Sequence, residues 1–266
     1  MFGALKELRE IPIPKMDEYH QKRLGYREHR INLENEQIDE PLINVHELGI
    51  AGENYYFRVD NPPYYQRIPH SIPDLKLRKS VVDRLARANE KLARIGLELY
   101  LFDGYRPIEV QNYFYDHWFP NYLKSIHPEL EGDMLEAEVA KYWAKGAKSS
   151  SEIDPLSPPP HSTGGAVDLT IRRKSTGEHL YMGSLFDDVT EIAHCDFLEK
   201  VSEQRILNFS EDEALKNRRL LHWLLMEQEF SFNPAEWWHF SYGDQLWARL
   251  GERDAAIYSF AGYTKP

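Results

Sequence analysis

The chain has 266 residues, of which 42% are hydrophobic and 13% aromatic, a composition typical of a globular protein with a sizeable core. Its formal net charge is -11 and no basic stripe offsets it, which argues against nucleic acid or an acidic membrane as a partner. The chain begins without the apolar run of a signal peptide and contains no 18-residue apolar stretch, so we expect a soluble, cytoplasmic protein. A single cysteine, Cys195, excludes an internal disulfide and a cysteine-rich zinc site; we expect it to be a small buried residue.

Residues 1 to about 70 mix charged residues, prolines and tyrosines without sustained periodicity, which predicts mostly loop with short strands and one helix. The run Asn61-Pro62-Pro63-Tyr64-Tyr65 indicates an extended or turn segment. We expect its tyrosines on the packed surface rather than in a pocket. We interpret residues 1–70 as an N-terminal extension packed on a domain that spans residues 71–266.

A helix followed by a strand is predicted after Pro73. Asp74 is a suitable N-cap, Gly96 a suitable C-cap, and the apolar residues between them recur at steps of three and four. Residues 97–102 then alternate as in a strand, which stops at the segment Asp103-Gly104-Tyr105-Arg106-Pro107. By itself, Arg106 would be an ordinary surface arginine on a turn.

The region from residue 108 to about 155 is predicted to be a helical insert. One helix is rich in aromatic residues and a second covers Met134 to Trp143, with Pro120 and His127-Pro128 between them. Serines and prolines then indicate a loop that delivers the chain to His161 in an extended conformation.

A first half of a metal site follows this loop. The turn at Gly164-Gly165 leads into a strand in which Val167, Leu169 and Ile171 share one face, so that Asp168 points away from the core. His161 before the turn and Asp168 on the strand are seven residues apart and can meet at one metal ion.

The second half lies near the C-terminus, after a predicted helix at residues 211–228 whose His222 we expect to be packed or on the surface rather than a ligand. In a strand over residues 237–242, His239 would face the site. Glu236 is three residues from His239, so a straight strand would point the two apart. A bend near Pro234 would bring Glu236 round.

These residue types suit metal-assisted hydrolysis. His161, Asp168 and His239 would give a catalytic zinc three ligands and leave one position for a water, whose pKa falls from about 15.7 to near 7 when bound. Glu236 is the candidate general base and acid, and the permanently charged fork of Arg106 could hold an oxyanion. Each residue alone fits an ordinary structural role as well; the joint pattern is what indicates a site.

The joint pattern resembles a known family, the zinc D-alanyl-D-alanine dipeptidases of peptidase family M15, from about residue 75 to 250. The resemblance implies an α+β fold with a mainly antiparallel sheet flanked by helices and the zinc site on the sheet. It also implies one Zn2+ per chain and the same roles for the five residues named above. Asp187, in a segment similar to the family's, would meet the substrate's free ammonium. The segments that carry the resemblance are Asp103 to Pro107, His161 to Asp168, Met182 to Asp187 and Glu236 to Asp244.

We therefore expect a zinc dipeptidase of cell-wall chemistry that hydrolyses a small peptide such as D-Ala-D-Ala. Pro159 stands where the family commonly has a pocket serine, two residues before the first histidine, which leaves the dipeptide's identity and stereochemistry open. One alternative is a carboxypeptidase or endopeptidase acting on longer peptidoglycan peptides, which an open groove would favour. The other is a non-catalytic zinc-binding protein, which a fourth protein ligand would favour. The oligomeric state and the roles of residues 1–70 and of the insert are not predicted.

Overall fold

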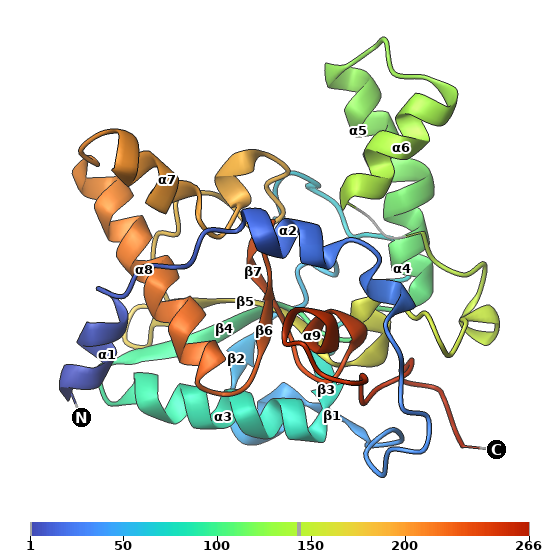
Figure 1. Cartoon of the computed structure of the whole chain (residues 1–266), viewed down its shortest axis with the longest axis horizontal. Coiled ribbons are helices and arrows are strands. Elements are labelled where there is room, and N and C mark those ends of the chain that lie inside the picture. The colour runs from blue at the N-terminus through green and yellow to red at the C-terminus, as the bar shows by residue number, and fades with distance from the viewer. Residues whose placement is uncertain (1, 143–144, 266) are drawn as a thin grey trace.

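The computed structural model describes residues 2–142 and 145–265, which form an α+β fold around a five-stranded sheet of order β2-β4-β5-β7-β6 (Figure 1). Strand β2 pairs with β4 in parallel and the other neighbours pair antiparallel, so the sheet is mixed. A second sheet pairs β1 (Leu42–Asn44) with β3 (Lys76–Arg78). The five strands are β2 (Ala51–Gly52), β4 (Leu97–Asp103), β5 (Ala166–Arg173), β6 (Ser231–Asn233) and β7 (Glu236–Ser241).

Helices cover the sheet and join its edges (Figure 1). Helix α3 (Lys79–Ala93) packs against β4, and α8 (Phe209–Met226) packs against β6 and β7. Helix α9 (Gln245–Leu250) contacts β6 and α2 (Asp17–Arg23), while α1 (Phe2–Leu8) and α7 (Phe197–Gln204) contact α8. Short 3-10 turns are η1 (Tyr26–Glu28), η2 (Val45–Leu48), η4 (Ser150–Glu152), η5 (Pro160–Thr163) and η6 (Glu191–Ala193). In the described parts of the chain, no helix combines the length and apolarity needed to cross a membrane.

The central strands confirm the predicted alternation. Every residue of β4 is buried, and Val167, Leu169 and Ile171 of β5 belong to the main hydrophobic core. The alternate residue Asp168 lies on the opposite face, beside Asp103 of β4. The face of β5 opposite these core residues thus carries the charged residues of the site.

The predicted helix start at Asp74 is wrong. Residues Lys76–Arg78 form β3, which pairs with residues more than thirty positions earlier in the chain, and the helix begins at Lys79. The buried guanidinium of Arg78 donates to Thr163 O at 2.8 Å, which ties β3 to the turn before β5. Leu77 fits a helical repeat, but this distant pairing decided its conformation. The helix ends at Ala93, and Gly96 follows with a positive φ of 75°.

The insert is more continuous than predicted. Helix α4 (Ile108–Tyr113), a π-helical turn η3 (Phe114–Trp118) and α5 (Phe119–Ile126) succeed one another without a break. Pro120, the second residue of α5, lies just after the π-helical turn, where the hydrogen-bond pattern already departs from that of an α-helix. Helix α6 (Gly132–Tyr142) packs on α5, and the two project from the body at the upper right of Figure 1. Trp143, the expected end of the second helix, lies outside the described residues.

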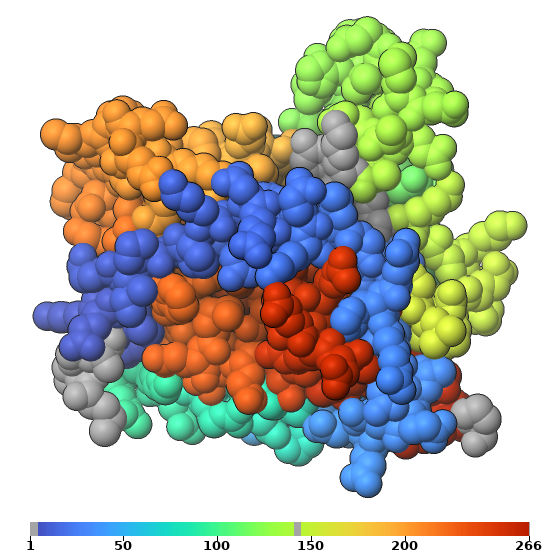
Figure 2. All heavy atoms as spheres, viewed as in Figure 1, coloured from blue at the N-terminus to red at the C-terminus, as the bar shows by residue number. Residues whose placement is uncertain are grey.

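The N-terminal residues contain more helix than predicted, with both α1 and α2. Figure 2 shows them in blue as a band lying over the orange and red C-terminal elements. The band is attached by buried contacts: Met16 N donates to Asp196 Oδ2 at 2.8 Å, and the Tyr19 ring packs 5.0 Å from that of Phe232. Cys195 is buried as expected, and burial raises the pKa of its thiol to about 12.

His222 is a packed histidine, one of the two roles expected of it. Its ring lies 4.7 Å from that of Phe232, and neither ring nitrogen has a hydrogen-bond partner among the described groups. Burial lowers its pKa to about 3. Because this folded-state pKa lies below the unfolded value near 6.5, the neutral ring is favoured by folding, and stability is lost as the pH falls through 6.5.

We expect the titration of His222 alone to lower the free energy of unfolding by about 2 kcal/mol when the pH falls from 7 to 5. Urea unfolding of wild type and His222→Leu at both pH values measures the difference, and the variant should lose less on acidification. His127→Gln, at an exposed histidine, is the control and should behave as wild type. An identical pH dependence in His222→Leu and wild type would show that His222 is not the group that titrates.

Candidate metal centre

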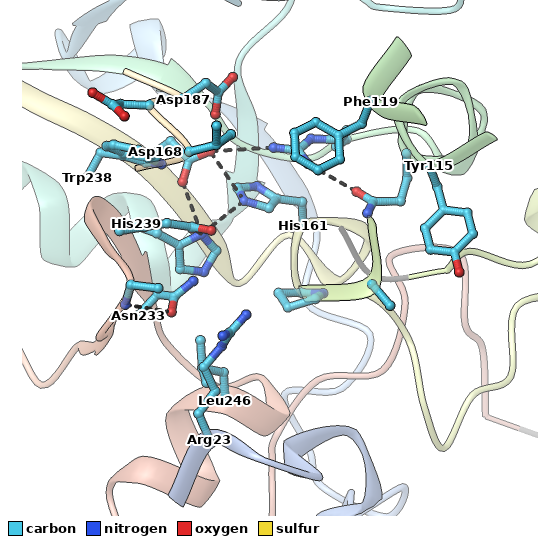
Figure 3. Close-up of a pocket in the computed structure, with 18 of the residues that line it drawn as sticks. Arg23, Tyr115, Phe119, His161, Asp168, Asp187, Asn233, Trp238, His239 and Leu246 are labelled. Carbon is cyan, nitrogen blue, oxygen red and sulfur yellow. Dashed lines mark hydrogen bonds and ion pairs between the residues drawn. The ribbon is translucent and has the colours of Figure 1, made fainter. Parts of the chain in front are cut away.

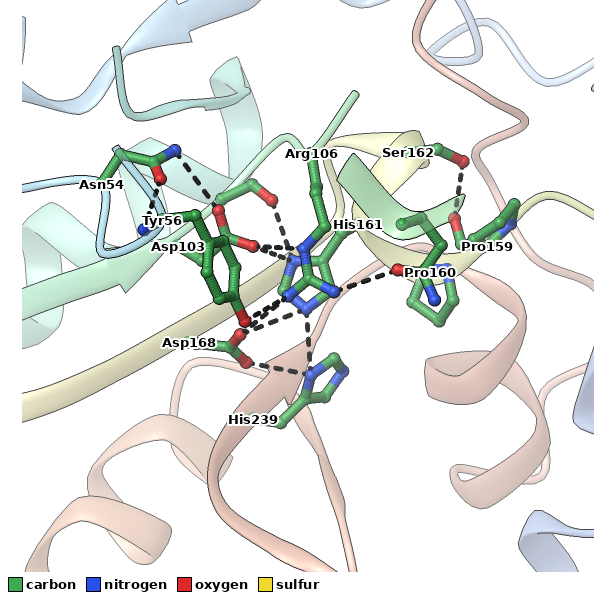
Figure 4. Close-up of polar contacts among 12 residues, drawn as sticks. Asn54, Tyr56, Asp103, Arg106, Pro159, Pro160, His161, Ser162, Asp168 and His239 are labelled. Atoms are coloured by element: carbon green, nitrogen blue, oxygen red, sulfur yellow. Dashed lines mark hydrogen bonds and ion pairs between the residues drawn. The ribbon is translucent and has the colours of Figure 1, made fainter. Parts of the chain in front are cut away.

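Two histidines and an aspartate converge on the polar face of the sheet. Asp168 of β5 and His239 of β7 are direct partners in the antiparallel pair, so their side chains share a face. His161, from η5, reaches the same point. Its Nε2 lies 3.2 Å from His239 Nδ1 and 3.4 Å from Asp168 Oδ2, and His239 Nδ1 lies 3.0 Å from Asp168 Oδ1 (Figure 4). All three residues are buried, and their ligand atoms lie within 4.8 Å of one another.

The donor set fits a divalent cation. Asp168 Oδ1 lies 3.0 Å from His239 Nδ1, yet neither that nitrogen nor any other described group makes a hydrogen bond to it. A buried carboxylate oxygen without a partner costs on the order of 1–3 kcal/mol or more. The ligand atoms of the three side chains converge on one position, and a cation there would satisfy this oxygen.

The tautomer of His161 is set by a backbone carbonyl. Its Nδ1 lies 2.8 Å from Gly104 O, which can only accept, so Nδ1 must carry the proton. Nε2 is then left with its lone pair directed at Asp168 and His239. Gly104 belongs to the strand-end segment predicted from the sequence, so this segment orients a candidate ligand as well as carrying Arg106.

The tautomer of His239 is set by a relay from α9. Ser241 Oγ donates to Asp244 Oδ2 at 2.7 Å and must therefore accept from His239 Nε2, 3.3 Å away. His239 Nδ1 is thus the free nitrogen. Asp244 is itself held in place as the N-cap of α9, where its Oδ1 accepts from Trp247 N at 2.8 Å. Partners of this kind orient metal-binding histidines and raise their basicity.

The charges within the group balance one another. Burial by itself would raise the pKa of Asp168, but His161 and His239 hold that pKa well below its ordinary value. Burial would also lower the pKa of His239, and the Asp168 carboxylate outweighs it, so the pKa of His239 is raised. A cation would compete with the proton for the same nitrogen, so metal affinity is expected to fall at acidic pH.

Arg106 lies buried at the edge of this group (Figure 4). Its Nε donates to Asp103 Oδ2 at 2.8 Å, Nη1 to Gln111 Oε1 at 3.0 Å, and Nη2 lies 3.5 Å from Asp168 Oδ2. Burial opposes the charge, but Tyr56, Asp103 and Asp168 more than compensate and raise the pKa of Arg106 further. The sequence reading of Arg106 as part of the site rather than the surface agrees with this position.

Asp187 lines the same cavity and is held by two tyrosines. Its Oδ2 accepts from Tyr56 Oη at 2.9 Å and from Tyr64 Oη at 2.7 Å. Burial, with the charge of Asp168 next, raises the pKa of Asp187 to about 8. The expectation that Tyr64 lies on packed surface is wrong: it lines the cavity, and its neighbour Tyr65 is exposed. Adjacent tyrosines cannot be assigned to surface or pocket without knowing what packs on each.

Glu236 reaches the group through an irregularity in strand pairing. The register of β6 and β7 shifts between Phe232 and Asn233, and Asn233 pairs with Glu236 across a turn that contains Pro234. Glu236 Oε2 consequently lies 3.6 Å from His239 Nδ1. The predicted bend is confirmed. Glu236 remains outside the group of residues whose atoms could hold a metal ion.

All six residues predicted from the sequence line one cavity of about 550 Å³ (Figure 3). This is within the usual range for a small-molecule site. Sequence reasoning missed Tyr56, Asp103 and Arg23, which take part in the network or line the cavity. Asp103 stood in the segment that carried Arg106 and could have been noticed. Tyr56 and Arg23 lie in the aperiodic N-terminal part, which offered no local signal.

A family model described as peptidase M15, D-ala-D-ala dipeptidase, matches residues 74–257. The chain belongs to this family and is a metallopeptidase. The resemblance drawn from the sequence is thereby confirmed. The matched region contains the six predicted site residues, whereas Arg23, Tyr56 and Tyr64 precede it.

Curated relatives share this assignment. The D-alanyl-D-alanine dipeptidase of Synechocystis sp. is 36% identical over 183 residues, 65% of this chain and 71% of that protein. The enzyme of the same name from Enterococcus faecium is 32% identical over 170 residues, 62% of this chain and 72% of that protein. Among solved structures, the LdcB LD-carboxypeptidase aligns at a TM-score of 0.30 and 16% identity, covering 67% of this chain and 65% of that one, a likeness too low to bear on function.

Proposed function

We propose that the chain is a zinc-dependent dipeptidase that hydrolyses a small dipeptide such as D-Ala-D-Ala. The observation that carries the proposal is the convergence, in one cavity, of a three-ligand group with Glu236, Arg106 and Asp187. Relatives named D-alanyl-D-alanine dipeptidase support the substrate class.

Zinc suits the spacing of the ligand atoms. Zinc binds nitrogen and oxygen at about 2.0–2.1 Å, and in a tetrahedron this bond length separates neighbouring ligand atoms by about 3.3 Å. The separations here are 3.0, 3.2 and 3.4 Å. We therefore propose one zinc ion on the sheet, held by His161, Asp168 and His239. When bound, it would supply Lewis acidity and a water with a pKa near 7.

The remaining residues divide the work of peptide hydrolysis. Glu236 takes the proton from the attacking water and returns it to the leaving amine. Arg106 donates to the oxygen that becomes negative as the carbonyl is attacked. Asp187 receives the substrate's ammonium, whose charge favours the ionised carboxylate over the protonated form that burial promotes.

Two alternatives are less well supported. In the described chain, no fourth residue completes the metal group, which speaks against a purely structural zinc site. A carboxypeptidase or endopeptidase on longer peptides would need room beyond the ammonium site, whereas Asp187 is enclosed by the hydroxyls of Tyr56 and Tyr64, the second of which also lines the cavity. We also propose that residues 1–70 are an extension packed on a peptidase domain of residues 71–266, with a helical insert at about 108–155.

The test is turnover of a dipeptide panel in both stereochemistries by the zinc-loaded protein, with released amino acids measured by mass spectrometry. We expect hydrolysis of D-Ala-D-Ala or a close relative, abolished by chelation and restored by zinc. The absence of turnover for every dipeptide, with wild type equal to Glu236→Ala, would overturn the proposal.

A further inference from the structure

The cavity is lined by an aspartate, Asp187, and by an arginine, Arg23, on opposite sides of the metal group. Asp187 and Arg23 lie at opposite ends of the view in Figure 3, with Asp168 and His239 between them. Arg23 is the last residue of α2, and Figure 3 shows its side chain directed from that helix toward the cavity. It belongs to the N-terminal band and precedes the region matched by the family model.

Arg23 differs from the other cations that line the cavity. Arg106 pairs with Asp103 at 2.8 Å, Lys145 with Glu136 at 2.9 Å, and Arg27 donates to the backbone carbonyls of Lys145 and Ser157. No carboxylate or carbonyl partner of Arg23 is found in the described parts of the chain. In a protein with a net charge of -11, a half-buried arginine without a partner stands out.

The surroundings of Arg23 leave it as a fixed positive charge. The imidazoles of His20 and His194, which line the same cavity and interact electrostatically with Arg23, are 4.9 Å apart, and burial lowers the pKa of both, so they are neutral at pH 7. A guanidinium presents a planar fork that matches a carboxylate, which makes a carboxylate the natural occupant of this end.

The backbone around Arg23 is held in place. The carbonyl oxygen of its neighbour Lys22 accepts from Arg249 Nε at 3.0 Å. Met16, just before the helix, is anchored on Asp196 as described above. These contacts fix the backbone position from which the Arg23 side chain extends, so binding an anion there does not require the helix to be ordered first.

Resting on the proposed dipeptidase function, we propose that Arg23 binds a carboxylate on the C-terminal residue of the substrate. That carboxylate is either the peptide's terminal group or an acidic side chain. With Asp187 receiving the ammonium, a terminal carboxylate at Arg23 would place a charged group at each end of the substrate and so limit its length. Specificity would then depend on a segment outside the family's matched region.

The experiment compares substrates that differ only in one carboxylate. D-Ala-D-Ala is set against D-Ala-D-alaninamide, and D-Ala-D-Glu against D-Ala-D-Gln, with kcat and KM measured separately. In wild type we expect kcat/KM for the acid to exceed that for the amide by about 10- to 100-fold, in the substrate pair whose carboxylate Arg23 binds. In Arg23→Gln and Arg23→Met that ratio should fall to near 1, mostly through KM. The pair whose ratio falls identifies the source of the carboxylate.

Lys22→Gln is the matched control, since Lys22 lies on the same helix with its ammonium paired to Glu18 and Glu252. It should leave both ratios unchanged. If both acid-to-amide ratios stay at the wild-type value in folded Arg23 variants, the proposal is wrong. Arg23 would then be only a favourable cation at a helix C-terminus, and its substitution would lower the melting temperature slightly. If wild type cleaves none of the four peptides, the dipeptidase function is wrong instead. Calorimetric titration of zinc-loaded Glu236→Gln with the same peptides then tests Arg23 alone. Equal affinities for acid and amide, both in Glu236→Gln and in the double variant that also carries Arg23→Gln, would overturn the role of Arg23.

Discussion

Glu236→Ala is expected to lower kcat for the dipeptide by about 10²- to 10⁴-fold while leaving one zinc per chain. Glu236 Oε2 lies 3.6 Å from His239 Nδ1, close to the metal group but not part of it, so in the proposed mechanism its loss removes a proton carrier rather than a ligand. Stopped assays give kcat, and elemental analysis of the dialysed protein gives the zinc content.

His239→Ala is the contrasting variant. It removes a ligand whose Nδ1 faces both Asp168 and His161, so zinc and activity should be lost together. Glu236→Gln, which keeps size and polarity, should resemble Glu236→Ala. Loss of zinc from either Glu236 variant would contradict the separation between base and ligands.

Arg106→Lys is expected to lower kcat by about 10²- to 10³-fold, the usual effect of losing an oxyanion donor. Lysine keeps the positive charge but not the fork that spans Asp103, Gln111 and Asp168. Arg106→Ala is a poorer test, because it leaves two buried carboxylates without their partner and would cost about 3–5 kcal/mol of stability.

A phosphinate dipeptide separates catalysis from simple positioning, because its tetrahedral oxygens stand in for the attacked carbonyl. If Arg106 stabilises that state, the affinity for the phosphinate should fall in parallel with kcat/KM across the variants. Arg58→Lys, at a surface arginine paired with Asp60, should change neither quantity. If kcat of Arg106→Lys stays within about 3-fold of wild type, Arg106 does not stabilise the oxyanion.

Local physical chemistry in the sequence accounts for the ligands and much of the frame. The glycine turn and the alternation after it placed Asp168 opposite the core strand face, and the same rule placed His239 with Ser241. Helix α8 begins at a capping box formed by Asn208 and Glu211. Such features depend on a few neighbouring residues, so they can be read from the chain directly.

Contacts between distant segments were decided only by the tertiary structure. Lys76–Arg78 became a strand because residues 42–44 pair with them, and the tautomers of the two histidines depend on Gly104 O and on Asp244, the N-cap of α9. Tyr64 donates a hydrogen bond to Asp187, which lies 123 positions later in the sequence.

The sequence by itself therefore determined which residues could bind the metal, which carboxylate could carry the proton, and to which family the chain is similar. Only the tertiary structure decided what surrounds them: the tyrosines on Asp187, the hydrogen bonds behind His239, and the place of Arg23 at the cavity, with no carboxylate or carbonyl partner in the described parts of the chain. The physical reason is that turns, caps and strand faces are set by local sterics and periodicity. The approach of the N-terminal band to the cavity depends instead on packing summed over the whole core, which no short segment encodes.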